Sequence, residues 1–510
     1  MPGKKARKHS LQKGDLVTLE IESLAPGGDG VGTCQGVTVF VARTAPGDRV
    51  EARLFDVRKD FARGSLESLL ESGPERVEPV CPVFSSCGGC QWQHVSYAGQ
   101  LSSKEDIVRQ AVRRIGGLEP DLVESCAGTS HHLRYRNKAQ FPVAVGAGGG
   151  LAAGYYERNS HKLVNIDGCP VVPEPLEHAL AEIKRALFRL RFSPYDETEH
   201  RGLLRHIVLR ESAENKAILA TLVLNAKEPG SKGAGSLTRE ERACLEQVAS
   251  EVIARLPSVS GFCLNFNNHR GNRILGDTTI CLEGSPSIEE VLRTSREDRP
   301  ERLRKGLAFQ LSTGSFFQVH SGQAVLILDE IYDLVKGRGS GLIIDAYAGV
   351  GVISMWVAGL AERIVSVEEN DRAVADGLAT VAANRIENIE FKQGKAEVIM
   401  PAMAEEGLRP DVIILDPPRK GAAPEVLQAA MSLMPELIIY VSCNPATLAR
   451  DLKILSRGTG INWQEKQAHI GYKTQRVKPV DLFPQTYHVE SIACLERVFH
   501  DGTVGNLEEI

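Results

Sequence analysis

Strand-like and helix-like segments alternate through residues 313–500, and this alternation constrains the fold more than any other feature. The apolar runs LIIDA, IVSVE, VIIL and LIIYVS are separated by stretches of helical character. Such a pattern is typical of a mostly parallel β-sheet covered by helices on both faces. Ligands bind beyond the carboxyl ends of the strands in sheets of this class. We therefore expect the functional site in the loops that follow these runs.

Two of these loops carry acidic and sulfur-containing groups. The run VIIL leads into Asp416 and the sequence DPPRKG, and the run LIIYVS leads into Cys443 and the sequence CNPATLARD. Both loops should face one cleft, because parallel strands end at the same edge of a sheet.

An earlier strand indicates a nucleoside cofactor. Asp345 ends an apolar run, Gly349 and Gly351 follow it, and Glu368 closes the next run. An acid at about this offset, one strand further along the chain, accepts hydrogen bonds from ribose hydroxyls. The full GxGxxG fingerprint of a dinucleotide site is absent, so a smaller cofactor such as S-adenosylmethionine fits better.

The paired loops favour methyl transfer to carbon 5 of a pyrimidine. Enzymes that methylate exocyclic amines usually place an aromatic residue after the DPP sequence, whereas Arg419 stands there in this chain. A thiolate that adds to carbon 6 makes carbon 5 nucleophilic, and a base must then remove the carbon 5 proton. The sequence offers Cys443 as the nucleophile and Glu490, in the last apolar run, as the base.

Three cysteines lie close together in the sequence CPVFSSCGGC. Cys81, Cys87 and Cys90 have five and then two residues between them, and Cys169 in IDGCP is a possible fourth ligand. Four thiolates suit either zinc or an iron–sulfur cluster, and the spacing leaves both open. The remaining cysteines outside the catalytic loop have no such neighbours in the sequence, and we interpret them as packing residues.

The part of the chain that precedes the alternating segments divides into two further regions. Short β-like runs with Gly and Pro turns predict a small antiparallel barrel over residues 14–70, which is either a nucleic-acid-binding module or a structural one. Residues 91–310 mix strand-like runs with helical segments and predict an α+β domain.

Composition and charge restrict the class of protein. The chain has 510 residues, too many for one ordinary core, and a net charge of -5 that does not indicate nucleic-acid binding by itself. Basic residues nevertheless gather at Lys4–Lys13 and at His131–Lys138. No apolar run is long enough to span a membrane and no signal segment follows the basic start, so we expect a cytoplasmic protein.

The motifs together resemble the RNA uracil-5-methyltransferase family of the RumA/TrmA type. The resemblance rests on SFFQV (315–319), DAYAGVG (345–351), LDPPRKG (415–421), VSCNPATLARD (441–451) and HVE (488–490). The sequence CPVFSSCGGC with Cys169 is similar to the [4Fe–4S] ligand set of this family, and the N-terminal segment 1–70 resembles its TRAM barrel.

The resemblance implies a multidomain α/β and β fold. Its expected parts are a basic tail (1–12), an OB-like TRAM β-barrel that binds RNA (13–72), a central α+β domain with the iron–sulfur cysteines (73–312), a Rossmann-like class I methyltransferase domain (313–500) and a C-terminal tail (501–510). It further implies a monomer that acts on RNA.

The resemblance also implies roles for individual residues. Cys443 is the expected nucleophile and Glu490 the expected base. The residues expected to contact S-adenosylmethionine are Gln318, Tyr347, Glu368 and Asp416, and those expected to hold a [4Fe–4S] cluster are Cys81, Cys87, Cys90 and Cys169. Tyr347 stands where Phe is frequent, and Lys395 and Glu397 replace a clear Asp, so the adenine contacts stay open.

The substrate is expected to be 23S ribosomal RNA, because the barrel and the cluster cysteines resemble the ribosomal branch of the family. Transfer RNA is the alternative substrate. A non-catalytic RNA-binding or assembly factor is the alternative of a different class, and the intact pair of Cys443 and Glu490 argues against it. The modified uridine, and whether there are one or two, cannot be inferred from the sequence.

Overall fold

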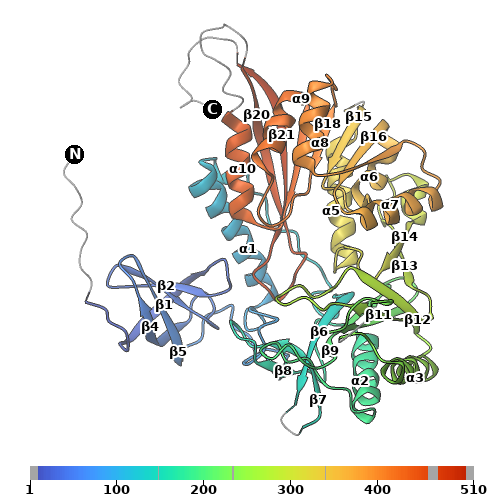
Figure 1. Cartoon of the computed structure of the whole chain (residues 1–510). Helices are drawn as coiled ribbons and strands as arrows, with labels where there is room; N and C mark the ends of the chain where they lie inside the picture. The colour runs from blue at the N-terminus through green and yellow to red at the C-terminus, as the bar shows by residue number, and fades with distance from the viewer. Residues whose placement is uncertain (1–9, 147–148, 232–234, 339, 458–468, 501–510) are drawn as a thin grey trace.

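The computed structural model describes residues 10–146, 149–231, 235–338, 340–457 and 469–500. The chain forms an N-terminal barrel, a central α+β region and a C-terminal α/β region (Figure 1). The basic residues Lys4, Lys5, Arg7 and Lys8 and the expected tail 501–510 lie outside the described residues.

The N-terminal barrel closes in the order β1-β2-β3-β5-β4. Its strands are β1 (Leu16–Leu24), β2 (Gly30–Cys34), β3 (Val37–Val41), β4 (Arg49–Val57) and β5 (Phe61–Glu71). Val17, Leu19 and Ile21 alternate with exposed residues along β1 and fill the interior. The predicted barrel is confirmed, but β3 and β5 pair in parallel. A closed barrel with an odd number of strands must contain at least one parallel pair.

The central region is built on a seven-stranded sheet of order β12-β11-β10-β9-β6-β7-β8. Its strands are β6 (Lys138–Val145), β7 (Leu151–Tyr156), β8 (Leu163–Asn165), β9 (Leu204–Glu211), β10 (Ile218–Leu224), β11 (Val259–Phe266) and β12 (Thr278–Gly284). Helices α2 (Glu174–Arg189) and α3 (Arg239–Arg255) pack together against it (Figure 1). A hairpin of β13 (Ser287–Leu292) and β14 (Leu307–Ser312) leads toward the C-terminal region.

The C-terminal sheet has the order β17-β16-β15-β18-β19-β21-β20. Its parallel strands are β15 (Ser340–Ala346), β16 (Ala361–Glu368), β17 (Ile389–Gln393), β18 (Val412–Leu415) and β19 (Leu437–Ser442). The strand β21 (Glu490–His500) runs antiparallel between β19 and β20 (His469–Val480). All residues of β18 and β19 are buried, as expected for central strands covered on both faces.

Alternate residues of the C-terminal strands face two separate cores. Ile343 packs with helices α5 (Ser321–Val335) and α6 (Val352–Val357), and α7 (Asp371–Ala383) lies on the same face. Ile344 packs on the other face, which is covered by α8 (Ala396–Glu405), α9 (Pro424–Leu433) and α10 (Pro445–Arg457). The predicted two-sided parallel sheet is therefore present, with one antiparallel edge.

An upstream segment also packs on the C-terminal sheet. Helix α1 (Tyr97–Ala111) and the π-helical turn Val112–Gly116 contribute Val108 and Val112 to the core beneath α10. Val123 then forms a parallel bridge to Val477 of β20. The chain thus contributes to the C-terminal region before it builds the central sheet.

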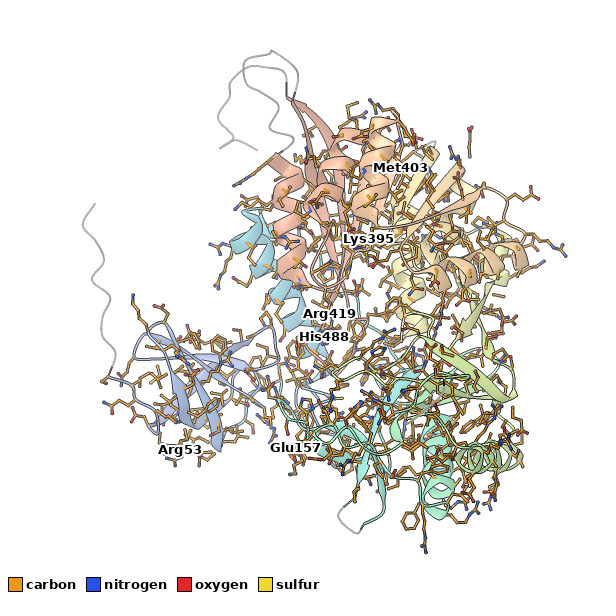
Figure 2. The ribbon with its side chains drawn as sticks, in the orientation of Figure 1. Arg53, Glu157, Lys395, Met403, Arg419 and His488 are labelled. Carbon is orange, nitrogen blue, oxygen red and sulfur yellow. The ribbon has the colours of Figure 1, made fainter. Side chains whose placement is uncertain are left out.

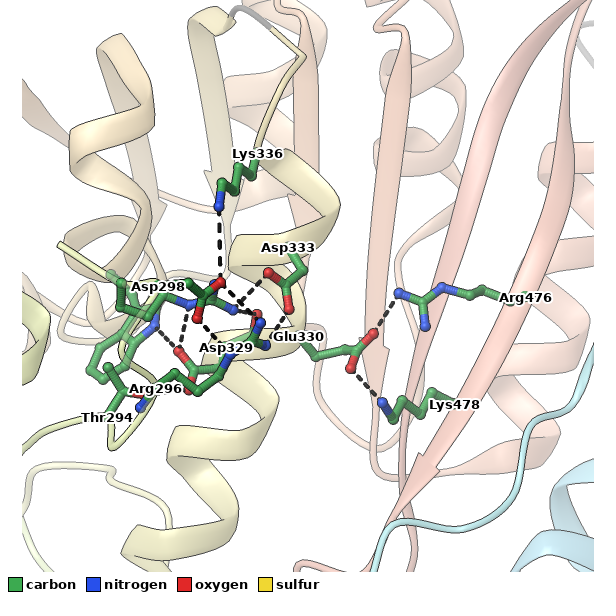
Figure 3. A network of polar contacts seen from close by, with 11 residues as sticks. Thr294, Arg296, Asp298, Asp329, Glu330, Asp333, Lys336, Arg476 and Lys478 are labelled. Carbon is green, nitrogen blue, oxygen red and sulfur yellow. Dashed lines mark hydrogen bonds and ion pairs between the residues drawn. The ribbon is translucent and has the colours of Figure 1, made fainter.

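A network of ion pairs holds α5 in place on two sides (Figure 3). The guanidinium of Arg299 is fully buried, contacts Asp298 at 2.8 Å and Asp333 at 2.7 Å, and lies 4.4 Å above the ring of Tyr332. On the opposite side, Glu330 pairs with Arg476 and Lys478 of β20. Among the residues that the structure describes, no helix is both long enough and apolar enough to cross a membrane.

Candidate active site

A cavity of about 1460 Å³ lies at the carboxyl ends of the C-terminal strands. It is lined by all six residues that were predicted to bind cofactor or act on substrate, namely Gln318, Tyr347, Glu368, Asp416, Cys443 and Glu490. Figure 2 places Lys395 and Arg419, which also line this cavity, at the edge of the C-terminal region that faces the central region. Residues from segments far apart in the sequence therefore meet in one space.

The loop after β15 brings backbone close to the cavity. Tyr347, Gly349 and Gly351 all adopt positive φ angles, and a Cβ atom on Gly351 would lie 2.8 Å from the ring of Phe391. Glu368 accepts hydrogen bonds from the backbone N–H groups of Gly349 (2.9 Å) and Asn370 (2.8 Å). Its carboxylate is therefore fixed in orientation where a ribose could bind.

Two carboxyl groups lie near this loop: Asp345 is buried behind it, and Asp416 lines the cavity. Asp345 accepts a hydrogen bond from the Ser354 hydroxyl at 2.5 Å, and burial raises the pKa of Asp345 to about 7. Burial also raises the pKa of Asp416 to about 7, and the nearby charge of Asp345 adds to the shift. One acid in the cavity lining, Asp416, and one behind it, Asp345, therefore have pKa values well above the ordinary carboxyl range.

Cys443 and Glu490 extend from neighbouring antiparallel strands. Ser442, the last residue of β19, pairs with Ser491 of β21, so that the next positions bring Cys443 and Glu490 together. Burial and, to a smaller extent, the Glu490 charge raise the pKa of Cys443 to about 11, and the Arg419 charge opposes both effects. Burial also raises the pKa of Glu490 well above its usual range, with a further contribution from Asp416.

Hydrogen bonds tie the two catalytic loops together. Asn444 donates its side-chain N–H to the Arg419 carbonyl at 3.0 Å, and Arg450 donates to the Lys420 carbonyl at 3.1 Å. Asp451 accepts from the Tyr440 hydroxyl at 2.5 Å and from the backbone N–H of Ala422 at 3.0 Å. The polar residues after Cys443 therefore hold the DPPRKG loop in place, a function that sequence reasoning did not assign to them.

The segment with Gln318 is held by the central sheet. Lys138 of β6 donates to the Thr313 carbonyl at 3.1 Å, and Arg210 of β9 donates to the Ser315 carbonyl at 2.5 Å. Phe316 projects from this segment with 70% of its surface exposed and lines the cavity. Its place in the SFFQV sequence was the only signal for it, since an exposed aromatic residue is not recognisable from spacing.

The four predicted cluster cysteines line a second, smaller cavity of about 220 Å³. Burial, together with the neighbouring thiols of Cys81 and Cys87, raises the pKa of Cys90 to about 12 and that of Cys169 to about 11. The thiols are therefore mutual neighbours. Within the described ranges, however, no group of three or more His, Cys, Asp or Glu side chains is arranged to hold a metal ion. An iron–sulfur site is thus not shown in the central region.

Comparisons with known proteins identify two regions of the chain. Residues 297–498 match the family model of tRNA (uracil-5-)-methyltransferases, and residues 11–66 match the TRAM domain. The chain is 37% identical to an uncharacterized RNA methyltransferase of Gloeobacter violaceus, over 98% of this chain and 100% of that protein. It is 38% identical to one of a Nostoc species, over 96% of this chain and 98% of that protein.

A solved structure has the same fold. It is the tRNA (uracil-54, C5)-methyltransferase of Pyrococcus abyssi in complex with S-adenosyl-L-homocysteine, with a TM-score of 0.67 and 24% identity. The match covers 94% of this chain and 100% of that chain. Taken with the full-length relatives, the protein belongs to the S-adenosylmethionine-dependent RNA uracil-5-methyltransferase family.

Proposed function

We propose that this protein methylates carbon 5 of a specific uridine in 23S ribosomal RNA. The observation that carries the proposal is the single cavity in which Cys443 and Glu490 stand beside Asp416 and Glu368. A target base must leave its stack to reach such a cavity, and looped or single-stranded RNA makes this inexpensive.

In the proposed mechanism Cys443 is the nucleophile. As the thiolate, its sulfur forms a bond to carbon 6 of the uracil while the π bond between carbons 5 and 6 breaks, and this makes carbon 5 electron-rich. S-adenosylmethionine, when bound, supplies an electrophilic methyl group. After carbon 5 has been methylated, the carboxylate of Glu490 takes the carbon 5 proton and the sulfur leaves carbon 6. Burial of Glu490, which is 3% exposed, excludes water that would compete for the proton.

We assign the cofactor contacts to Gln318, Tyr347, Glu368 and Asp416. The backbone hydrogen bonds that orient Glu368 support a role as ribose acceptor. Tyr347 lies at the glycine-rich turn after β15, where its positive φ of 65° directs the side chain into the cavity.

We further propose that Cys81, Cys87, Cys90 and Cys169 hold a [4Fe–4S] cluster. The donor set fits, because four neighbouring thiols line a cavity with room for more than a single ion, and Arg136 beside them supplies a cation for an anionic cluster. These cysteines lie outside the catalytic cavity, so we assign the group a structural role or a role in RNA folding. Protein purified without oxygen should be brown, whereas a zinc protein would be colourless.

Transfer RNA is the second candidate substrate. Two observations favour it, since the matching family model describes tRNA methyltransferases and the solved structure with the same fold acts on uridine 54 of tRNA. The presence of a TRAM barrel and of the four cysteines favours the ribosomal substrate.

Mapping of 5-methyluridine in both RNAs from a deletion strain tests the proposal. We expect one or two ribosomal positions to lose the modification and to regain it when the gene is restored. Loss confined to transfer RNA would overturn the ribosomal assignment. RNA that contains 5-fluorouridine should form a covalent adduct with the wild-type protein, because fluorine cannot leave as a proton does. A missing adduct under turnover conditions would overturn the covalent mechanism.

A further inference from the structure

The loop between β11 and β12 forms a wall of the catalytic cavity although it belongs to the central region. Residues 272–277 line the cavity together with the catalytic residues of the C-terminal sheet. Residues 268–273, which include the first two of these, are all exposed to solvent. The loop therefore faces the cavity on one side and solvent on the other.

Three buried polar side chains hold this loop in one conformation. Arg205 of β9 is 4% exposed and donates to the carbonyls of Asn267 (2.8 Å) and His269 (2.6 Å). Asn267, which is fully buried, donates to the carbonyls of Arg273 (2.6 Å) and Ile274 (2.9 Å).

The base of the loop is equally constrained by the third of these side chains. Asn265 accepts from the backbone N–H of Gly276 at 2.7 Å and donates to its carbonyl at 3.1 Å. A Cβ atom at Gly276 would lie 1.7 Å from the Phe266 carbonyl oxygen, so only glycine fits there. A loop that is rigid before binding loses little conformational entropy when a ligand binds, which is the arrangement expected of a recognition element.

Positive charge gathers on this loop at the cavity. Arg273 is 53% exposed and pairs with Asp277, which is 63% exposed. Arg273, Arg372 at the start of α7 and His269 together lower the pKa of Asp277, so these groups lie close to one another across the two regions. Because both partners are exposed, the ion pair between Arg273 and Asp277 contributes little energy and leaves the guanidinium available to a stronger anion.

We propose that the loop 267–277 is an RNA-anchoring element in which Arg273 binds a backbone phosphate next to the flipped uridine. The inference rests on the proposed function, since it assumes that RNA enters this cavity. Arginine suits the task because its planar fork binds two phosphate oxygens at once. Asp277 orients the guanidinium before RNA arrives, and Arg205 is a positioning residue that acts through the loop backbone.

The test measures binding of a short oligouridylate to the full-length protein. We expect Arg273→Gln to raise its Kd about tenfold, as for the loss of one charge-assisted contact. We also expect the dependence of log Kd on log salt concentration to lose about 0.7 in slope, the value for one phosphate contact on a single strand. Arg273→Lys should restore the slope but only part of the affinity, because lysine keeps the charge without the fork.

Arg242→Gln is the matched control. Arg242 is 54% exposed on α3, pairs with Glu246 four residues later as Arg273 does with Asp277, and lies outside the cavity lining. An unchanged Kd and salt slope in Arg273→Gln, or equal changes in the control, would overturn the proposal. So would a tenfold loss of S-adenosylhomocysteine affinity with RNA binding intact, because the anion would then be the carboxylate of the cofactor.

These outcomes are separable from a failure of the proposed function. If the wild-type protein forms no 5-methyluridine in any RNA, the methyl-transfer proposal fails whatever Arg273 does. If it forms 5-methyluridine and Arg273→Gln shows the same KM for RNA, the anchoring proposal alone fails. We expect the KM for RNA to rise in this variant while kcat changes less than twofold, because Arg273 stands outside the reacting groups.

Discussion

Two clusters of charged groups in the C-terminal region differ in whether a cation balances their carboxyl groups. Around Arg299, the cation contacts three carboxylate side chains and a tyrosine ring, and Asp329 also accepts from Thr294 (2.6 Å) and Trp356 (3.2 Å). At the catalytic cavity, Asp416 and Glu490 in the lining and Asp345 behind it all have raised pKa values, and the charge of Arg419 opposes the shift of Glu490. The first cluster is compensated, and the second is not.

The Arg299 cluster has a structural role, whereas the acids at the catalytic cavity have a chemical one. A compensated network offsets the cost of desolvation and fixes the position of α5, although it gives little net stability. An uncompensated carboxylate has a raised pKa and binds a proton more strongly, so Glu490 is a stronger base toward the carbon 5 proton. The fold therefore surrounds one buried cation with carboxylates where rigidity is needed, and gathers carboxyl groups with raised pKa values where proton transfer is expected.

The largest effect should follow removal of the sulfur in the uncompensated cluster. We expect Cys443→Ala to lower the rate of methyl transfer by at least about 10⁴-fold, because no other group can add to carbon 6. Thermal unfolding should stay within about 2 °C of wild type, which is what a partly exposed side chain allows. Radiolabelled methyl transfer to RNA measures the rate, and full activity in this variant would refute covalent catalysis.

Breaking the compensated cluster should damage stability and leave the chemistry intact. Arg299→Leu leaves the buried carboxylate of Asp329, which is 9% exposed, without its cation, and we expect it to lower the free energy of unfolding by about 3–5 kcal/mol. Arg296→Leu is the control, because Arg296 is 44% exposed in the same network and should cost under about 1 kcal/mol. Urea denaturation measures both. Equal losses in the two variants would contradict the contrast drawn between the clusters.

Removing one acid from the uncompensated cluster should stabilise the protein in a pH-dependent way. In the wild-type protein Asp345 ionises near pH 7, whereas its unfolded form ionises near pH 3.8, so unfolding becomes easier as pH rises between these values and changes no further above pH 7. We expect the Tm of Asp345→Asn to exceed that of wild type by about 5 °C at pH 8 and by much less at pH 5. A gain that is independent of pH would mean that the charge of Asp345 is not responsible.

The smallest effect should come from removing the cation beside the thiol. Arg419 lowers the pKa of Cys443, so Arg419→Gln should raise that pKa above about 11 and slow adduct formation with 5-fluorouridine about tenfold at pH 8. For both proteins the rate should rise tenfold for each pH unit between about 7 and 9, since the thiolate fraction does so below the pKa. Lys420→Gln removes an equal charge one residue further on. If it slowed the reaction as much, a general loss of RNA binding would explain both results.

The sequence was informative about local order and about the reacting groups. The apolar runs of the C-terminal region predicted its parallel strands. The polar loops after them predicted Asp416 and Cys443, and the last apolar run predicted Glu490, all of which line the cavity. Strand periodicity and strand ends are local properties, and they can be recognised without knowledge of the tertiary fold.

Other features depend on contacts between distant residues and could not be predicted. The packing of α1 beneath α10 joins an early segment of the chain to a late one, and the wall formed by residues 272–277 depends on Arg205, which has no special sequence context. The ion pairs of Arg299 are equally non-local, since Asp329 follows it by 30 residues. The iron–sulfur cluster stays a prediction from cysteine spacing and resemblance.

The position of β21 between β19 and β20 has a consequence for synthesis on the ribosome. Until β21 has emerged, β20 has no neighbour through which to join the sheet, and the cavity contains Cys443 without Glu490. The ammonium group of Lys104 likewise has no ion-pair partner until Asp481, which follows 377 residues later, has been synthesised. The cavity therefore stays incomplete during synthesis, and the reactive thiol meets its base only after β21 has been made.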